Sequence, residues 1–324
     1  MKAAILVFLG TLFATSIFPA SSDTLLVLSK REHTLAIVDP STLKVVAKAP
    51  VGEDPHEVIA SADGKFAYVS NYGGGRYNTL AVIDLVGHKA LPSIDLGALR
   101  GPHGLVFVGG KVWFTAEAAK AVGSYDPDKK GIDWIMGTGQ NRTHMLLVSE
   151  DMKRVITTNI SSATVTFIEK GATARDWNET VIGVGKGAEG FDITPDGQEL
   201  WTANAGDGTV SVIDMASRKV VATLPANVHS ANRLKFTPDG KLALISTLSG
   251  EDVVILDVKA RKETKRLKTG RGAAGIQMQP DGARAFVSCT PDNYVAVIDL
   301  KTLEIAGRID AGEEPDGLAW AVRR

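Results

Sequence analysis

The chain has almost no cysteine, no long apolar run after its first residues and no excess of charge of either sign. Cys289 is the only cysteine among 324 residues, so an internal disulfide and any zinc or iron–sulfur site built from several cysteines are excluded. No Cys-x-x-Cys-His sequence occurs, which excludes covalent c-type haem. Cys289 lies in an apolar, strand-like run, and we expect it to be a buried and unreactive thiol.

The charge balance argues against partners that are recognised by charge alone. There are 36 basic and 37 acidic residues, which leave a formal net charge of −1. Such a chain exerts no long-range attraction on a nucleic acid, and we expect no nucleic-acid partner. The sequence patterns of an α/β-hydrolase nucleophile, an EF-hand and a helical zinc protease are absent as well. Any chemistry must therefore come from residues that the fold brings together.

The N-terminal segment has the pattern of a secretory signal peptide. Lys2 supplies a positive charge, residues 3–17 are uncharged and mostly apolar, and small residues precede Asp23 at the −3 and −1 positions of a cleavage site. We expect residues 1–22 to be removed and the protein to be periplasmic or secreted. The alternative is an uncleaved anchor or a buried first strand. No later segment is long and apolar enough to cross a bilayer, so an integral membrane protein is not expected.

The rest of the chain is a tandem repeat. Each unit contains a short apolar strand, a tight turn, a second strand, a third strand of alternating polarity and a more polar fourth strand. The turn is written Asp-Gly in four units, which suits the positive φ angles of a hairpin. One marked position near the start of the first strand recurs at intervals of 41 to 47 residues, as expected for propeller blades. The marked residues are His56, His103, His144, Gly190, Asn232, Ala274 and Asp316.

The two ends of the chain supply parts of the same blade. Residues 24–52 contain only three strands, and the missing innermost strand is the sequence DGLAWAV at residues 316–322. A first blade assembled from both ends gives seven blades and leaves no large free sheet edge. The sequence therefore predicts an all-β fold, a seven-bladed β-propeller of four-stranded blades whose first blade is closed by the C-terminal strand. We expect one domain over residues 23–324, and a monomer.

The repeat resembles that of a known family. The sequence Tyr-Val-Ser-Asn at residues 68–71 differs at one position from the tetrapeptide of the YVTN-repeat propellers, and residues 61–85 follow the repeat of that family almost throughout. Other blades depart from it, such as Trp-Thr-Ala-Asn at residues 201–204. The resemblance covers residues 23–324. It implies a YncE-like exported propeller, within a wider group that includes lactonase-like enzymes and the haem-carrying domain of bacterial nitrite reductases.

The marked positions predict a binding site at one mouth of the central channel. The loop that enters each innermost strand reaches this mouth in a propeller, so histidines from three successive blades become neighbours. The alternative is that each histidine only hydrogen-bonds a loop carbonyl. Because a loop rim is open to water, we expect replacement of the three histidines to leave thermal stability nearly unchanged. The expected ligand-binding residues are His56, His103, His144, Arg142, Glu189, Asn232, Arg233 and Asp316.

Three functions fit such a site. The first is a binding module for a small molecule, a cell-envelope component or a partner protein, which needs no catalytic motif. The second is a metal-assisted lactone hydrolase, isomerase or lyase, in which His144, Glu189 and Arg233 are the catalytic candidates, and His56, His103 and His144 hold a divalent metal. The third, implied by the resemblance to nitrite reductases, is a redox propeller that binds haem non-covalently through one of the histidines.

Overall fold

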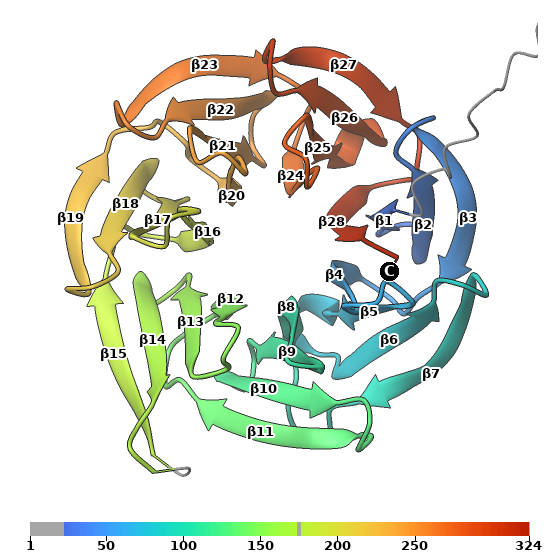
Figure 1. Cartoon of the computed structure of the whole chain (residues 1–324), viewed down its shortest axis with the longest axis horizontal. Coiled ribbons are helices and arrows are strands. Elements are labelled where there is room, and N and C mark those ends of the chain that lie inside the picture. The colour runs from blue at the N-terminus through green and yellow to red at the C-terminus, as the bar shows by residue number, and fades with distance from the viewer. Residues whose placement is uncertain (1–22, 174–175, 324) are drawn as a thin grey trace, which may run out of the picture.

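Seven four-stranded antiparallel sheets form a ring around a central axis in the computed structural model, which describes residues 23–173 and 176–323 (Figure 1). Strand β28 (Pro315–Ala321) pairs with β1 (Thr24–Ser29), so the C-terminal strand closes the first blade. Both parts of the fold prediction are confirmed. The predicted signal peptide lies outside the described residues. In the described part of the chain no helix has the length and hydropathy needed to span a bilayer.

Each blade runs from an innermost strand at the axis to an outermost strand at the perimeter. Blade 1 contains β28, β1, β2 (Thr34–Asp39) and β3 (Lys44–Pro50); blade 2 contains β4 (Pro55–Ala60), β5 (Phe66–Asn71), β6 (Thr79–Asp84) and β7 (Lys89–Asp95). Blade 3 contains β8 (Pro102–Val108), β9 (Lys111–Ala116), β10 (Ala121–Asp126) and β11 (Gly131–Gly137); blade 4 contains β12 (Thr143–Val148), β13 (Arg154–Asn159), β14 (Thr164–Lys170) and β15 (Trp177–Gly183). Blade 5 contains β16 (Ala188–Ile193), β17 (Glu199–Asn204), β18 (Thr209–Asp214) and β19 (Lys219–Leu224); blade 6 contains β20 (Ala231–Phe236), β21 (Leu242–Thr247), β22 (Asp252–Asp257) and β23 (Lys262–Lys268). Blade 7 contains β24 (Ala273–Met278), β25 (Arg284–Cys289), β26 (Tyr294–Asp299) and β27 (Glu304–Ile309).

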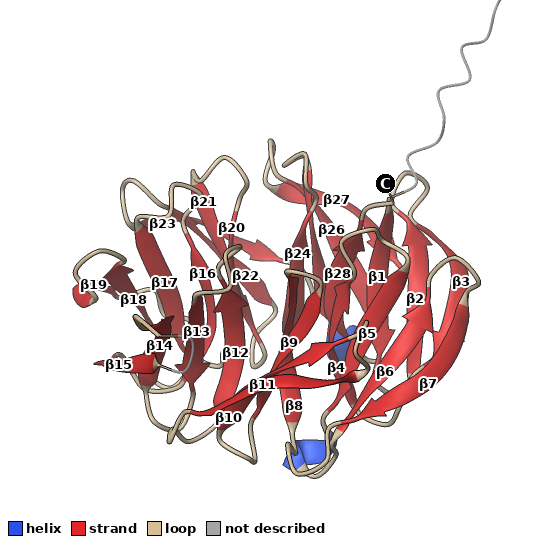
Figure 2. Ribbon diagram, turned by 60° about the horizontal axis from the view of Figure 1, so that its bottom comes forward, coloured by secondary structure: helices blue, strands red, loops and turns tan. Residues whose placement is uncertain are grey.

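The apolar core lies between neighbouring blades. The second and third strands are buried along most of their length, whereas outer strands such as β19 are largely exposed, as the polarity of the fourth strand predicts. Viewed from the side, the strands run between two faces of the ring, and loops cover both faces (Figure 2). The recurrent aspartate that ends the third strand accepts backbone hydrogen bonds in the following turn, as at Asp39, whose Oδ1 lies 2.8 Å from the nitrogen of Ser41.

Every innermost strand carries a bulge at the same place. In blade 2, Pro55 pairs with Asn71 and Val58 pairs with Val69, so three residue steps on β4 match two on β5. The other six blades show the same shift. A bulge redirects side chains that would otherwise alternate between the two sides of the sheet. Two consecutive residues per blade, the second and third of the innermost strand, therefore lie in the bulge beside the axis.

Candidate functional site

Buried hydroxyl groups of the second strands hold these bulges in place. In blade 3, Thr115 Oγ1 accepts a hydrogen bond from the nitrogen of Gly104 at 2.9 Å and donates one to the carbonyl of His144 in the next blade at 2.6 Å. Each such hydroxyl thus satisfies polar backbone groups that the bulge removes from the ladder. The same bridge to the next blade is made by Thr158 to Glu189, by Ser246 to Ala274 and by Ser288 to Asp316.

Two residues of each blade lie at the same end of the channel and form two rings. The first ring is the second residue of each innermost strand, and the second ring is the residue directly after each second strand. The first ring is His56, His103, His144, Glu189, Asn232, Ala274 and Asp316. The second ring is Lys30, Tyr72, Glu117, Ile160, Ala205, Leu248 and Thr290.

The strand register corrects the marked residue of blade 5. Ala188 pairs with Asn204 in the way that Pro55 pairs with Asn71, so Glu189 and not Gly190 occupies the ring position. The sequence comparison placed the marked position of this blade one residue too late. The distance to the Asp-Gly turn, which the bulge does not change, identifies the correct residue.

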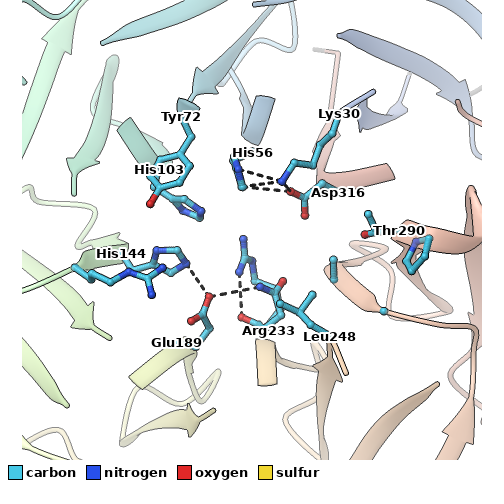
Figure 3. Close-up of a pocket in the computed structure, with 15 residues that line it drawn as sticks. Lys30, His56, Tyr72, His103, His144, Glu189, Arg233, Leu248, Thr290 and Asp316 are labelled. Atoms are coloured by element: carbon cyan, nitrogen blue, oxygen red, sulfur yellow. Dashed lines mark hydrogen bonds and ion pairs between the residues drawn. The ribbon is translucent and has the colours of Figure 1, made fainter. Parts of the chain in front are cut away.

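Both rings enclose a cavity of about 380 Å³ at the channel mouth (Figure 3). All eight residues that the sequence predicts for the ligand site line this cavity. The sequence reasoning missed Lys30, Tyr72, Leu248 and Thr290, which also line it, and Glu117, which lies behind it. Their shared position after the second strand is a repeat signal that would have identified them.

The three histidine rings lie next to one another in the cavity wall, each tilted against its neighbour. The ring of His103 lies between those of His56 and His144, with centroid distances of 5.0 and 3.7 Å. His103 and His144 are each only 3% exposed. The expectation that the histidines lie on an open rim is therefore wrong for these two. The expectation that their replacement leaves stability nearly unchanged stays a prediction, and their burial argues against it. The structure buries them because the bulges and their hydroxyl bridges bring neighbouring blades close together at this depth.

The arrangement of the three histidines does not favour the predicted metal site. The imidazole rings of His56, His103 and His144 contact one another side by side. Within residues 23–173 and 176–323, no group of three or more histidine, cysteine, aspartate or glutamate residues is arranged to hold a metal ion. The metal prediction therefore gains no support from the donor geometry, and it stays a prediction.

His144 is a buried cation between two carboxylates. Its Nε2 lies 2.8 Å from Glu189 Oε1, and its Nδ1 lies 3.5 Å from Glu117 Oε2. Burial alone lowers the pKa of His144, but attraction to Glu189 and Glu117 overcomes it and raises the pKa to about 9. Burial likewise opposes ionisation of Glu117, yet His144 and Arg142 hold its pKa at about 2. His144 therefore keeps its proton at neutral pH.

His103, in contrast to His144, is held in its neutral form. Its burial, followed by the positive charges of His144 and His56, holds its pKa well below the usual histidine value. Its Nδ1 is buried and has no hydrogen-bond partner among the described residues. The site thus places a neutral imidazole directly against a protonated one, 3.7 Å apart between ring centroids.

A second charged cluster lies beside His56. Lys30 Nζ is 3.0 Å from His56 Nε2 and 3.2 Å from Asp316 Oδ2. His56 Nε2 is also 3.2 Å from Asp54 Oδ1, and this contact is the main reason why the pKa of Asp54 lies well below its ordinary value. Lys30 comes from blade 1, which joins the C-terminal Asp316 to the N-terminal part of the chain. Closure of the first blade is therefore also needed to assemble the site.

An ion pair crosses the channel between blades that are far apart in the ring. The guanidinium of Arg233 in blade 6 contacts the carboxylate of Glu57 in blade 2; the Arg233 side chain is buried, and that of Glu57 is 12% exposed. Arg233 also donates to the carbonyl of Asn232 at 3.0 Å. Burial opposes the charge of Arg233, but Glu57, Asp316 and Glu189 raise its pKa. Both partners are third residues of innermost strands, which the bulges turn towards the axis.

Comparisons with known proteins identify the fold alone. No family model and no curated protein sequence matches the chain. Hydrazine synthase from Kuenenia stuttgartiensis superimposes with a TM-score of 0.74 and 20% identity over 90% of this chain and 99% of that chain. A 6-phosphogluconolactonase-like protein from Bacteroides uniformis gives 0.77 and 15% over 92% and 99%. The dihydro-heme d1 dehydrogenase NirN in complex with DHE gives 0.66 and 15% over 96% and 77%. All are seven-bladed propellers. They agree with the wider propeller group, including lactonase-like proteins, that the sequence resemblance implies.

Proposed function

We propose that this chain is an exported YVTN-type propeller that binds a small anion in the cavity at the channel mouth. The charge of the cavity lining carries this proposal. Lys30, Arg142, Arg233 and the protonated His144 line the cavity, and only two carboxylates do so. The export part rests on the N-terminal sequence pattern, and the family part on the Tyr-Val-Ser-Asn repeat.

Several polar groups of the lining remain available to a ligand. Arg142 uses its Nε to bind Glu117 at 2.6 Å, and half of its side chain is exposed, so a ligand can reach it from solvent. Asn232 Oδ1 is buried without a partner among the described residues. The Glu57 and Glu117 carboxylates that balance these cations lie outside the lining. A ligand carboxylate or phosphate can therefore reach the cations without being repelled by the carboxylates of Glu57 and Glu117.

The size of the cavity favours a small molecule over the cell-envelope or protein partner that the sequence also allows. A volume of about 380 Å³ lies near the lower end of the range for small-molecule pockets. Most residues of the first ring are buried in the wall and offer little surface to a flat protein partner. Residues from all seven blades converge on this one cavity, as orientation of a small polar ligand requires.

Calorimetric titration with a panel of small mono-, di- and tricarboxylates tests anion binding. Replacing Arg142→Gln should weaken binding of the best member about tenfold, because a charge-assisted hydrogen bond is lost. Arg271→Gln is the matched control, since Arg271 binds Asp292 at 2.6 Å and lies outside the cavity lining. Equal weakening by both substitutions, or tighter binding of neutral analogues than of anions, contradicts the proposal.

A second candidate is an acid–base enzyme, and the opposite protonation states of His103 and His144 favour it. Paired groups whose environments separate their pKa values are typical of acid–base catalysis. In lactone hydrolysis, neutral His103 accepts a proton from a water molecule whose oxygen attacks the carbonyl carbon. Arg233 stabilises the oxyanion, and His144 then donates its proton to the ring oxygen as the ester C–O bond breaks.

The pH dependence of lactone hydrolysis tests this second function. Activity requires His103 to be neutral and His144 to be charged, so it should fall at acidic pH and again as the pH rises through about 9. His103→Asn should remove at least 99% of the activity in a pH-stat assay with aliphatic and sugar lactones. No hydrolysis by the wild-type protein, or an unchanged rate in the variant, excludes this reaction.

The haem-binding function has only the shared propeller fold in its support. The NirN complex shows that a propeller of this architecture is found with a bound DHE ligand, but NirN shares only 15% identity with this chain. The absorption spectrum of the purified protein, with and without added haem, is the direct check. A haem absorption band that disappears on replacement of the cavity histidines would support this function over the other two.

A further inference from the structure

In several blades, one residue reaches back towards the preceding blade and fills the junction between them. It directly precedes the fourth strand, and we call it the wedge residue. Leu43, Arg218, Arg261 and Leu303 occupy this position with φ values between 53° and 59°. Leu43 packs against the apolar core of blade 7, and Leu303 packs against that of blade 6.

The arginine wedge residues fill their junctions through ion pairs and, at Arg218, a contact with an aromatic ring. The guanidinium of Arg218 lies 4.5 Å from the ring centroid of Phe167 in blade 4 and 2.7 Å from Glu169 Oε1. Arg261 pairs with Glu199 of blade 5. Leucine and arginine therefore serve the same purpose, because each covers the outer side of the core between two blades.

Lys130, the wedge residue of blade 3, does not fill its junction. Its side chain is exposed and has no ion-pair partner in the described part of the chain. A cavity of about 640 Å³ lies between blades 2 and 3 and is lined in part by Lys130. This cavity is larger than the one at the channel mouth and lies within the range of small-molecule sites.

The walls of this junction cavity are aromatic. Phe66 and Tyr68 of blade 2 and Tyr125 of blade 3 line it, together with two prolines. The ring of Tyr68 also stacks on Phe107 across the junction at 6.0 Å, which fixes its orientation. Tyr68 is 5% exposed, so this wall of the cavity is part of the packed junction between the two blades.

The charges around the cavity indicate the sign of a ligand that would fit it. Asp95 and Asp128 line it, against the single cation Lys130. Burial, followed by Tyr125, Asp63 and Asp128, raises the pKa of Tyr68 to about 12, so this phenol stays uncharged at neutral pH. Two carboxylates against one ammonium group give the lining a net negative charge, which attracts a cation.

We propose that the cavity between blades 2 and 3 binds an organic cation, an ammonium group carried on an apolar body. The faces of Phe66, Tyr68 and Tyr125 attract a cation through their ring quadrupoles and cover its apolar groups. Asp128 compensates its charge at the rim. This site lies on the outer side of the blades and is independent of the function proposed for the channel mouth.

Saturation-transfer NMR titration with benzyltrimethylammonium tests the proposal. The variant Lys130→Leu places leucine where Leu43 and Leu303 already fill equivalent junctions at the same backbone angles, so it should close the cavity and reduce affinity at least tenfold. His88→Leu is the matched control, because His88 is the exposed wedge residue of blade 2 and does not line the cavity. This control should bind the probe as the wild-type protein does.

A second variant separates closure of the cavity from loss of the lysine charge. Lys130→Gln keeps the cavity open and removes the one cation of its lining, so it should tighten binding of benzyltrimethylammonium about twofold to threefold. Benzoate, which has a similar ring and the opposite charge, should bind at least tenfold more weakly than the cation. The proposal is overturned if benzoate binds as well as the cation, if Lys130→Leu binds like wild type, or if Lys130→Gln abolishes binding.

Discussion

Replacing His144→Gln should remove a pH-dependent part of the stability of the propeller. The imidazole is buried between Glu189 and Glu117, which raise its pKa from an ordinary 6.5 to about 9. A difference of this size between the unfolded and folded chains corresponds to about 3 kcal/mol of folding free energy. It is of the same order as the cost of breaking a buried ion pair, about 3–5 kcal/mol.

The sign of the pH dependence follows from the direction of the pKa change. His144 binds its proton more tightly in the folded chain, so its contribution is fully present below pH 6.5 and is lost as the pH rises through about 9. The variant lacks this proton at every pH. Its melting temperature should therefore lie about 5 °C below that of the wild type at pH 7, and the difference should shrink markedly by pH 10.

Thermal denaturation followed by circular dichroism between pH 6 and pH 10 measures this difference. Lysines and tyrosines that titrate near the alkaline end affect both proteins alike, so the difference between the two curves isolates His144. His88→Gln, at an exposed histidine, should give no difference at any pH. If the gap between wild type and His144→Gln stays constant over the range, the proton is not held by this histidine and the reasoning fails.

Three further outcomes follow from buried groups and from ring closure. Arg233→Met should cost about 3–5 kcal/mol in denaturant unfolding because it leaves the mostly buried Glu57 carboxylate unpaired. Adding Glu57→Leu should recover most of that loss, and a double variant as unstable as the single one argues against the pair. Deleting residues 315–324 removes β28 and its five residue pairs with β1, so the truncated chain should show no cooperative melting, and an unchanged transition refutes this. Cys289 is fully buried and its pKa is raised to about 11, so its thiol should react with an aromatic disulfide reagent only during unfolding, and prompt reaction of the native protein is the contrary result.

The repeat pattern was sufficient to predict the architecture. A blade is specified locally, by a turn dipeptide such as Asp63-Gly64, by strands of period two and by a polar outer strand. Counting the units and noting the strand missing at the N-terminal side was enough to identify the seven blades and the role of β28. Local signals of this kind survive in one sequence because each unit must form its own hairpins before it can pack against its neighbours.

The same periodicity predicted the candidate site in part. Seven equivalent positions in a ring must meet at the axis, so His56, His103 and His144 were expected to be neighbours and are. Lys30 and Tyr72 were missed because they belong to a second equivalent position, which carries no recurring residue type to draw notice. The ring position of blade 5 was marked one residue too late, although Glu189 itself was among the predicted ligand-binding residues, and the spacing to the Asp-Gly turn would have corrected it.

What the residues do in the site was decided only by the tertiary structure. The sequence shows that His103 and His144 occupy equivalent positions in their blades. In the structure, however, His103 is neutral and His144 is protonated. Two carboxylates from other strands surround His144, whereas His103 meets only burial and positive neighbours. The junction cavity beside Lys130 is likewise invisible in the repeat. Both depend on distances between side chains of different blades, and such distances are set by packing across the ring rather than by any local pattern in the chain.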